Sequence, residues 1–182
     1  MCGSGKSVVA DVFVAHGYQF LRFGQITMEE IKRRNLEVSE ANERAVREGF
    51  RKEHGMGAYA ILNIPKIEEL LKHGPVIVDG LYSWSEYKVL KENYGDRFIT
   101  IAIYAPPKTR YARLDTRVNM KEDTALRNRR FSPEQAKARD CAEIENIEKG
   151  GPIAMADYTI TNDGTLDELK TRTETLVKIL ER

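Results

Sequence analysis

Short apolar runs alternate along this chain with longer stretches whose apolar residues recur at helical spacing. The apolar runs predict strands at residues 18–24, 75–79, 98–105 and 157–162. The intervening stretches predict helices, and the last of them carries an apolar stripe that we expect in the core, made of Leu166, Leu169, Leu176, Val177 and Leu180. Strands that alternate with helices predict an α/β domain built on a parallel sheet.

Polar residues mark where several of these helices begin and end. Ser39 is placed to cap one helix, and Gly55 and Gly57 separate it from the next. A helix over residues 133–149 should stop at Gly150 and Gly151. Capping boxes are predicted at four further helix starts, by the pairs Thr27 and Glu30, Ser83 and Glu86, Ser132 and Gln135, and Thr165 and Glu168.

The 182 residues are enough for one domain, which we expect to span 1–182. Residues 25–73 form a charged, mostly helical insert between two strands. The insert is either a solvated helical surface or a subdomain that binds an acceptor. A smaller lid is expected at about 117–140.

Composition excludes several classes of protein. With 29 Lys and Arg against 28 Asp and Glu, the net charge is +1, which argues against a dedicated binder of nucleic acid or of membrane surfaces. Cys2 and Cys141 form no zinc-binding spacing with each other or with the three histidines. The chain shows no signal peptide and no apolar run long enough to span a membrane, so we expect a reduced, cytoplasmic protein.

The opening stretch MCGSGKS carries the first chemical signal. Gly5, Lys6 and Ser7 match the end of the phosphate-binding pattern G-x-x-x-x-G-K-[ST], in which backbone amides cradle phosphates. We predict that Cys2, Gly3, Ser4, Gly5 and Lys6 bind the phosphates of ATP and that Ser7 holds Mg²⁺. The alternative is a disordered Gly/Ser-rich terminus, which an immediate amphipathic helix disfavours.

The first glycine of that pattern and the strand that should precede it are absent from this sequence. We interpret this as the truncation of a central strand that would lie between residues 75–79 and 98–104. The structure should then show either a slot about 9 to 10 Å wide, twice the usual strand spacing, or a collapsed sheet in which those two strands pair directly. We favour the slot and expect a marginally stable chain, because buried backbone groups would lack partners.

Asp79 ends the apolar run Val76–Val78 and supplies a second signal. A carboxylate at the carboxyl end of a buried parallel strand can orient Mg²⁺ or accept the proton of an attacking hydroxyl, although such a residue is often structural.

Residues 108–130 contain eight basic and three acidic residues and supply a third signal. Arg110, Arg113 and Arg117 share one side of a predicted helix. The cluster either is a solvated face or neutralises a transferring phosphoryl group.

Four motifs together resemble the nucleoside-monophosphate-kinase-like P-loop proteins, with dephospho-CoA kinases and adenylate-kinase-related proteins nearest. They are GSGKS, IVDG, the pair Arg113 and Arg117, and ADYTITN with its Asn162. The resemblance covers essentially the whole chain and implies a three-layer P-loop kinase sandwich. It implies that Lys6, Asp79, Arg113 and Arg117 are catalytic, that Arg127, Arg129 and Arg130 reach the phosphates from the lid, and that the turn at Asn162 lies beside the adenine.

The function that follows is an ATP-dependent and Mg²⁺-dependent phosphotransferase acting on a small acceptor, either dephospho-CoA or a nucleoside monophosphate. Gln25 and Met28 depart from the Asp and Arg that such relatives often use to grip the acceptor. A module that binds ATP without transferring phosphate therefore stays open. A GTPase switch is disfavoured because the chain has no N-K-x-D motif for reading the base.

Overall fold

The computed structural model describes residues 1–117 and 130–181. Its four strands lie close to the predicted ranges: β1 Gln19–Arg22, β2 Val76–Asp79, β3 Ile101–Tyr104 and β4 Tyr158–Thr161. β1 pairs in parallel with β2, and β3 pairs in parallel with β4. The prediction of an α/β fold with parallel strands is therefore confirmed.

Helices cover most of the remaining described residues. They are α1 Lys6–Ala15, α2 Gln25–Arg33, α3 Glu40–His54, α4 Ala58–Leu71, α5 Trp84–Tyr94, α6 Pro107–Asp115, α7 Pro133–Ile147, α8 Gly150–Ala154 and α9 Leu166–Leu180, with a 3₁₀ turn η1 at Gly95–Arg97. The helical insert predicted at 25–73 corresponds to α2, α3 and α4.

Most of the predicted helix starts are confirmed. Ser39 caps α3, and capping boxes open α5, α7 and α9. The capping box predicted at Thr27 is wrong, because α2 begins at Gln25 and Thr27 lies inside it. The buried Thr27 hydroxyl instead lies 2.6 Å from the Tyr59 hydroxyl. The expected stop at Gly150 is also wrong. α7 ends at Glu148 in a left-handed conformation, and Gly150 begins α8.

The strands form two separate two-stranded sheets, and no pairing joins β2 to β3 in the part of the chain that the structure describes. The collapsed arrangement with those strands paired is therefore wrong, while the width of a slot between them stays a prediction. α1 connects the two sheets, because Val9 and Phe13 share one apolar cluster with Ile77 of β2 and Ile103 of β3. The sheets are thus held together by a helix and not by a shared ladder.

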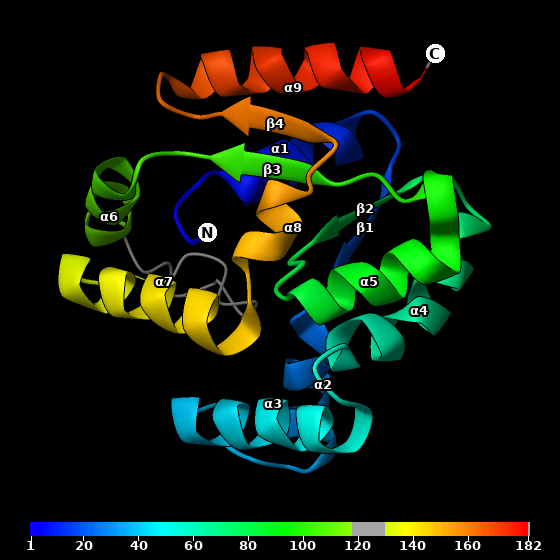
Figure 1. The fold of residues 1–182 in the computed structure, drawn as a ribbon, viewed down its shortest axis with the longest axis vertical. Coiled ribbons are helices and arrows are strands. Elements are labelled where there is room, and N and C mark those ends of the chain that lie inside the picture. Colours follow the sequence, from blue (N-terminus) through cyan, green and yellow to red (C-terminus); the bar gives the residue numbers. More distant parts are fainter. Residues whose placement is uncertain (118–129, 182) are drawn as a thin grey trace.

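Helices flank these strands on both sides (Figure 1). α9 lies over β4 and α1, and its residues Leu169, Leu176 and Val177 are buried as predicted. Leu166 contradicts the prediction, since 54% of its surface is exposed at the first turn of α9.

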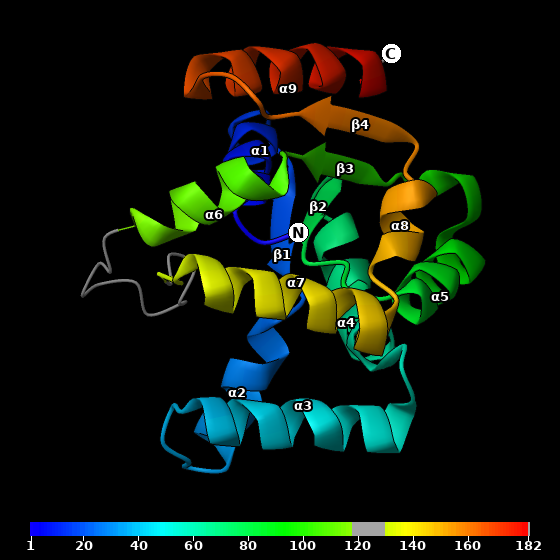
Figure 2. The same cartoon turned by 60° about the vertical axis from the view of Figure 1, so that its left-hand side comes forward.

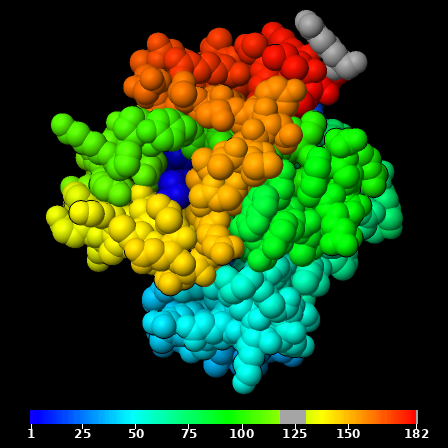
Figure 3. Space-filling view, in the orientation of Figure 1, coloured from blue at the N-terminus to red at the C-terminus, as the bar shows by residue number. Residues whose placement is uncertain are grey.

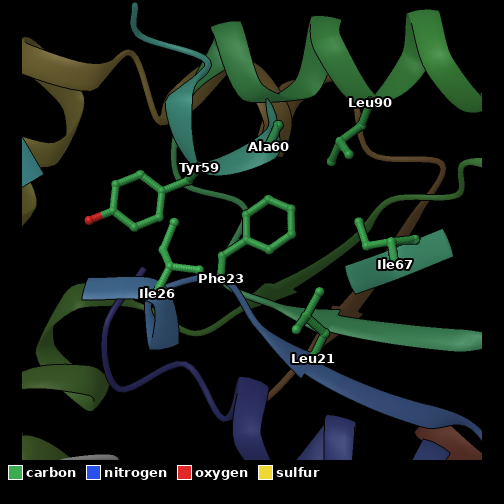
Figure 4. Packing of buried hydrophobic residues seen from close by; sticks show 7 residues of the cluster. All are labelled: Leu21, Phe23, Ile26, Tyr59, Ala60, Ile67 and Leu90. Atoms are coloured by element: carbon green, nitrogen blue, oxygen red, sulfur yellow. The ribbon is translucent and has the colours of Figure 1, made fainter. Parts of the chain in front are cut away.

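A second core joins the helical insert to β1 (Figure 4). Phe23 at the end of β1 is fully buried at its centre. The other members of this core are Leu21, Ile26, Tyr59, Ala60, Ile67 and Leu90. Because α2 and α4 bury side chains here, the insert is anchored to the rest of the domain at this end, while α3 lies at its outer edge.

The carboxylate of the α5 capping box gives a prediction about pH. Burial raises the pKa of Glu86 to about 7, although the amides of Tyr82 and Ser83 donate to its Oε2 and oppose the shift. As pH rises above 4.5 the unfolded chain releases this proton first, so the folded state loses up to about 3 kcal/mol of stability as the pH rises to 7. Glu86→Gln should remove that loss, measured by urea unfolding at pH 5 and pH 8.

The matched control is Glu168→Gln, which changes the same position of the exposed capping box in α9. Its carboxylate lies in water, so this variant should keep the wild-type difference in stability between the two pH values. An unchanged pH dependence in Glu86→Gln would show that the buried carboxylate is not responsible.

Candidate functional site

The loop that precedes α1 has the backbone conformation of an anion-binding nest. Gly3 has φ +76° and Gly5 has φ +101°, both in the region that favours glycine. A Cβ on Gly3 would lie 2.9 Å from the Arg110 carbonyl oxygen, and one on Gly5 would overlap the Asn162 amide nitrogen. The loop is therefore packed too closely from behind to accept a side chain at either position.

Two loop carbonyls are held from behind by long-range hydrogen bonds. Arg110 Nη1 donates to the carbonyl of Cys2 at 3.1 Å, and Asn162 Nδ2 donates to the carbonyl of Ser4 at 2.8 Å. Arg113 in turn donates to the Asn162 carbonyl at 3.0 Å and to its Oδ1 at 3.3 Å. Arg113 and Asn162 thus come together with the loop and support its backbone in this structure.

Lys6 opens α1 at the floor of the site. Its Nζ donates to the Met1 carbonyl at 2.8 Å. Burial and the nearby charge of Lys149 lower the pKa of the Lys6 ammonium, and Asp79 partly opposes this by favouring the charged form. Lys6 and Asp79, predicted separately, are therefore close enough to act on each other.

A nucleotide with Mg²⁺ fits the groups that the site offers. Gly3 and Gly5 carry no side chain of their own that could cover the loop amides, and the Ser7 hydroxyl and Asp79 carboxylate are the kind of oxygen donors that Mg²⁺ prefers. Among the described residues, no group of three or more His, Cys, Asp and Glu could hold a metal by itself. Mg²⁺ commonly takes one or two protein oxygens and completes its shell with phosphates and water, so two such oxygens are a sufficient protein contribution.

Three charged residues that the sequence analysis missed lie close to this floor. Glu143 on α7 forms ion pairs with Arg139, at 3.0 Å, and with Lys149, which is nearly fully buried. Burial opposes the effect, but Lys149 and Arg139 lower the pKa of Glu143 to about 2. The charge spacing of Arg139 and Glu143 is that of any exposed helix, so nothing in the sequence distinguished them.

Tyr82 lies between these charges and the carboxyl ends of β1 and β2. Lys149 Nζ lies 4.9 Å from the centre of its ring, and a Cβ on Gly80 would touch the ring at 2.9 Å. Burial and the charge of Asp79 raise the pKa of Tyr82. The site therefore continues from the loop across Asp79 to the end of the helical insert.

The surface is hollowed at this place. Figure 3 shows an opening between α6, α7 and α8 with blue N-terminal atoms at its floor. Turned by 60°, the ribbon shows α6 and α7 side by side, with the N-terminus behind them (Figure 2). Residues far apart in the sequence thus surround one recess.

The predicted lid at 117–140 is described in part. Arg117 follows α6 and is half-buried, and Arg130 Nη2 lies 3.1 Å from Asp115 Oδ1. Arg127 and Arg129 lie outside the described residues, and so does the segment 118–129 that would form most of the lid. Their predicted roles therefore stay predictions.

Comparison with known proteins places the chain in a family. A model described as an AAA domain matches residues 1–154. The chain belongs to this AAA domain family. It is a P-loop NTPase-like kinase family, which supports nucleotide binding as a general property, while the residues of this chain that would bind the nucleotide stay a prediction.

Relatives of this chain include archaeal proteins. The UPF0200 protein of Thermococcus gammatolerans is 32% identical over 100% of this chain and 93% of the relative, and that of Pyrococcus furiosus is 33% identical over 99% and 94%. A UPF0200/UPF0201 protein of Archaeoglobus fulgidus is 36% identical over 91% of this chain, which spans 49% of that relative. Neither the family description nor these names state a substrate.

The crystal structure of TT1252 from Thermus thermophilus also matches, with a TM-score of 0.49, 16% identity, and coverage of 98% of this chain and 93% of that one. Within residues 1–117 and 130–181, no helix is long and apolar enough to cross a bilayer.

The glycine loop gives a prediction with a matched control. Gly5→Ala forces a side chain into a left-handed conformation, which costs about 1 to 3 kcal/mol, and also pushes it against Asn162. Gly17→Ala meets the same backbone strain at φ +89° but open space. Both variants should unfold at lower urea concentration, and only Gly5→Ala should lose affinity for a fluorescent ATP analogue. Equal affinity in the two variants would contradict the assignment of the loop.

Proposed function

We propose that this AAA domain is an ATP-dependent phosphotransferase that moves the γ-phosphate to a small acceptor, either dephospho-CoA or a nucleoside monophosphate. The observation that carries the proposal is the crowding of cations at the floor of the recess. Lys6 is half-buried near the ammonium of Lys149, and its partial removal from water together with this second charge lowers the pKa of Lys6. A bound polyphosphate would relieve the repulsion, because it places negative charge between the cations.

The chain's own groups divide the work of such a transfer. The amides of Gly3 and Gly5 and the Lys6 ammonium would bind the phosphates. Ser7 would hold Mg²⁺, with Asp79 as a second oxygen donor in one of its two possible roles, and the metal would supply positive charge to the phosphates. Arg139 is placed beside Cys2 and Glu143, where its guanidinium stabilises charge that develops during transfer. Arg117 and Arg127 extend this set from the lid in the same proposal.

The acceptor lies on the side of the helical insert. The Tyr82 hydroxyl lies close to Gly24, which follows β1, and to Gly80, which follows β2. A Cβ atom added to either glycine would lie within 4 Å of this hydroxyl, so the hydroxyl faces the carboxyl ends of both strands. Asp79 ends β2 at the same edge and is positioned to orient an acceptor hydroxyl or to accept its proton. Gln25 is the first residue of α2, and Met28 follows one turn later. The insert therefore offers the acceptor no charged side chain at these two positions.

The first test is product analysis with ATP, Mg²⁺ and a panel of acceptors: dephospho-CoA, AMP and other nucleoside monophosphates. Phosphate should appear on one of them, and Lys6→Met should reduce the rate by roughly 100-fold or more while the protein stays folded. Lys170→Met, which removes an exposed lysine on α9, should keep the wild-type rate. Hydrolysis of ATP with no transfer to any acceptor would contradict the proposal and favour the ATP-binding module.

The second test separates the two roles open to Asp79. Asp79→Asn keeps the shape of the side chain and removes its charge. If the carboxylate accepts the acceptor's proton, kcat should fall by roughly 100-fold with little change in the Kd for ATP and Mg²⁺. If Asp79 instead acts on the metal, Asp79→Asn should weaken ATP binding when Mg²⁺ is present and leave it unchanged when Mg²⁺ is omitted.

A further inference from the structure

Arg110 is one of the three arginines predicted to share one side of a helix, and only 4% of its surface is exposed. Its guanidinium reaches three separate parts of the fold. Nε donates to the Ala105 carbonyl at 3.0 Å, just beyond β3, and Nη1 donates to the Cys2 carbonyl in the glycine loop. Nη2 forms a 2.5 Å ion pair with Asp140 Oδ2 on α7.

Asp140 completes this arrangement from α7. It is 4% exposed, and its Oδ2 also accepts a hydrogen bond from the Tyr111 hydroxyl at 3.0 Å. Its Oδ1 is buried with no hydrogen-bond partner in the described part of the chain. A buried ion pair with an unpaired oxygen is a poor way to gain stability, since desolvation offsets much of the attraction. The positions that this ion pair gives to Arg110 and to α7 are therefore more important than its contribution to stability.

The contact with Cys2 has a direct consequence for the loop. In a trans peptide the carbonyl and the following N–H point in opposite directions, and the described chain has no cis peptide bond. When Arg110 holds the Cys2 carbonyl outward, the Gly3 N–H of the same peptide is turned toward the recess. Asn162 has the same effect on the Gly5 N–H through the carbonyl of Ser4.

We propose that Arg110 and Asp140 are a buried positioning pair that aims the amides of the glycine loop and fixes α7 relative to it. Arg110 holds the conformation of the loop, and Asp140 holds the position of the Arg110 guanidinium. Because Arg139 precedes Asp140 directly on α7, the same pair fixes the helix that carries this arginine beside the loop. That the aimed amides bind phosphate rests on the proposed function, whereas the control of loop geometry does not.

Cys2 allows the loop to be observed without any ligand. Its thiol belongs to the loop, and Cys141 is an exposed thiol on α7 of the same molecule. Mass spectrometry after limited treatment with iodoacetamide gives the alkylation rate of each cysteine. The Kd for ATP with Mg²⁺ is measured in parallel on the same protein.

The variants are Arg110→Met and Asp140→Asn, both assayed well below their melting temperatures. Each should raise the Cys2 alkylation rate several-fold, leave the Cys141 rate unchanged, and weaken ATP binding by about tenfold, the effect of losing one oriented hydrogen bond. If Arg110→Met does not fold, Arg110→Lys keeps the positive charge without the three-way fork and should show the same change in Cys2.

The control is Asp115→Asn. It breaks the exposed Asp115–Arg130 pair, which also joins the end of α6 to the segment before α7 but does not reach the loop. This variant should leave both the Cys2 rate and the Kd unchanged.

The outcomes separate the two proposals. Folded Arg110 and Asp140 variants with a wild-type Cys2 rate and a wild-type Kd, whatever their melting temperatures, would overturn the positioning role. A wild-type chain that does not bind ATP would overturn the proposed function, and the Cys2 rate would still decide the role of the pair.

Discussion

The candidate site depends on carbonyl groups that point away from it. A loop that binds phosphate through its amides must keep those amides directed at one point, and glycines alone permit this conformation without enforcing it. Here the carbonyls of Cys2 and Ser4 are held by Arg110 and Asn162. Since these two residues come from α6 and from the end of β4, the loop conformation is set by parts of the chain more than 100 residues away.

The residues at the two ends of β4 have different tasks, one in the sheet and one in the candidate site. Asp157 just before β4 accepts two hydrogen bonds from Thr100, through its amide at 2.7 Å and its hydroxyl at 2.8 Å, and so fixes the start of the β3–β4 ladder. Asn162 just after β4 holds the glycine loop. One short strand thus transmits the alignment of its sheet to the loop, and the motif ADYTITN is explained by these two tasks.

Local patterns predicted the elements well and the contacts between them poorly. Capping residues and apolar runs located the strands and most helix starts, because those signals act within a few residues. The capping box at Thr27 was predicted wrongly because its hydroxyl contacts Tyr59 on another helix. The burial of Leu166 was predicted wrongly because the first turn of α9 directs this side chain toward water. Local motifs predicted Lys6 and Asp79 as site residues, which stays a prediction. Arg139, Glu143 and Lys149 could not be predicted in this way, because only the folded chain brings them near the loop.

The charges around the recess explain how it can exist before an anion arrives. Lys6, Lys149 and Arg139 would repel one another in a region poor in water, and the low pKa of Glu143 keeps a negative charge between Arg139 and Lys149 at neutral pH. Among the described residues, no carboxylate forms an ion pair with Lys6, whose ammonium donates to the Met1 carbonyl, although the charges of Asp79 and Glu143 favour its charged form. The electrostatic imbalance is therefore concentrated on Lys6 at the end of the glycine loop, where the aimed amides add their own positive potential. An anion that bound there would gain from both at once, so we expect phosphate at the loop in preference to Arg139 on α7 and Lys149 just after it.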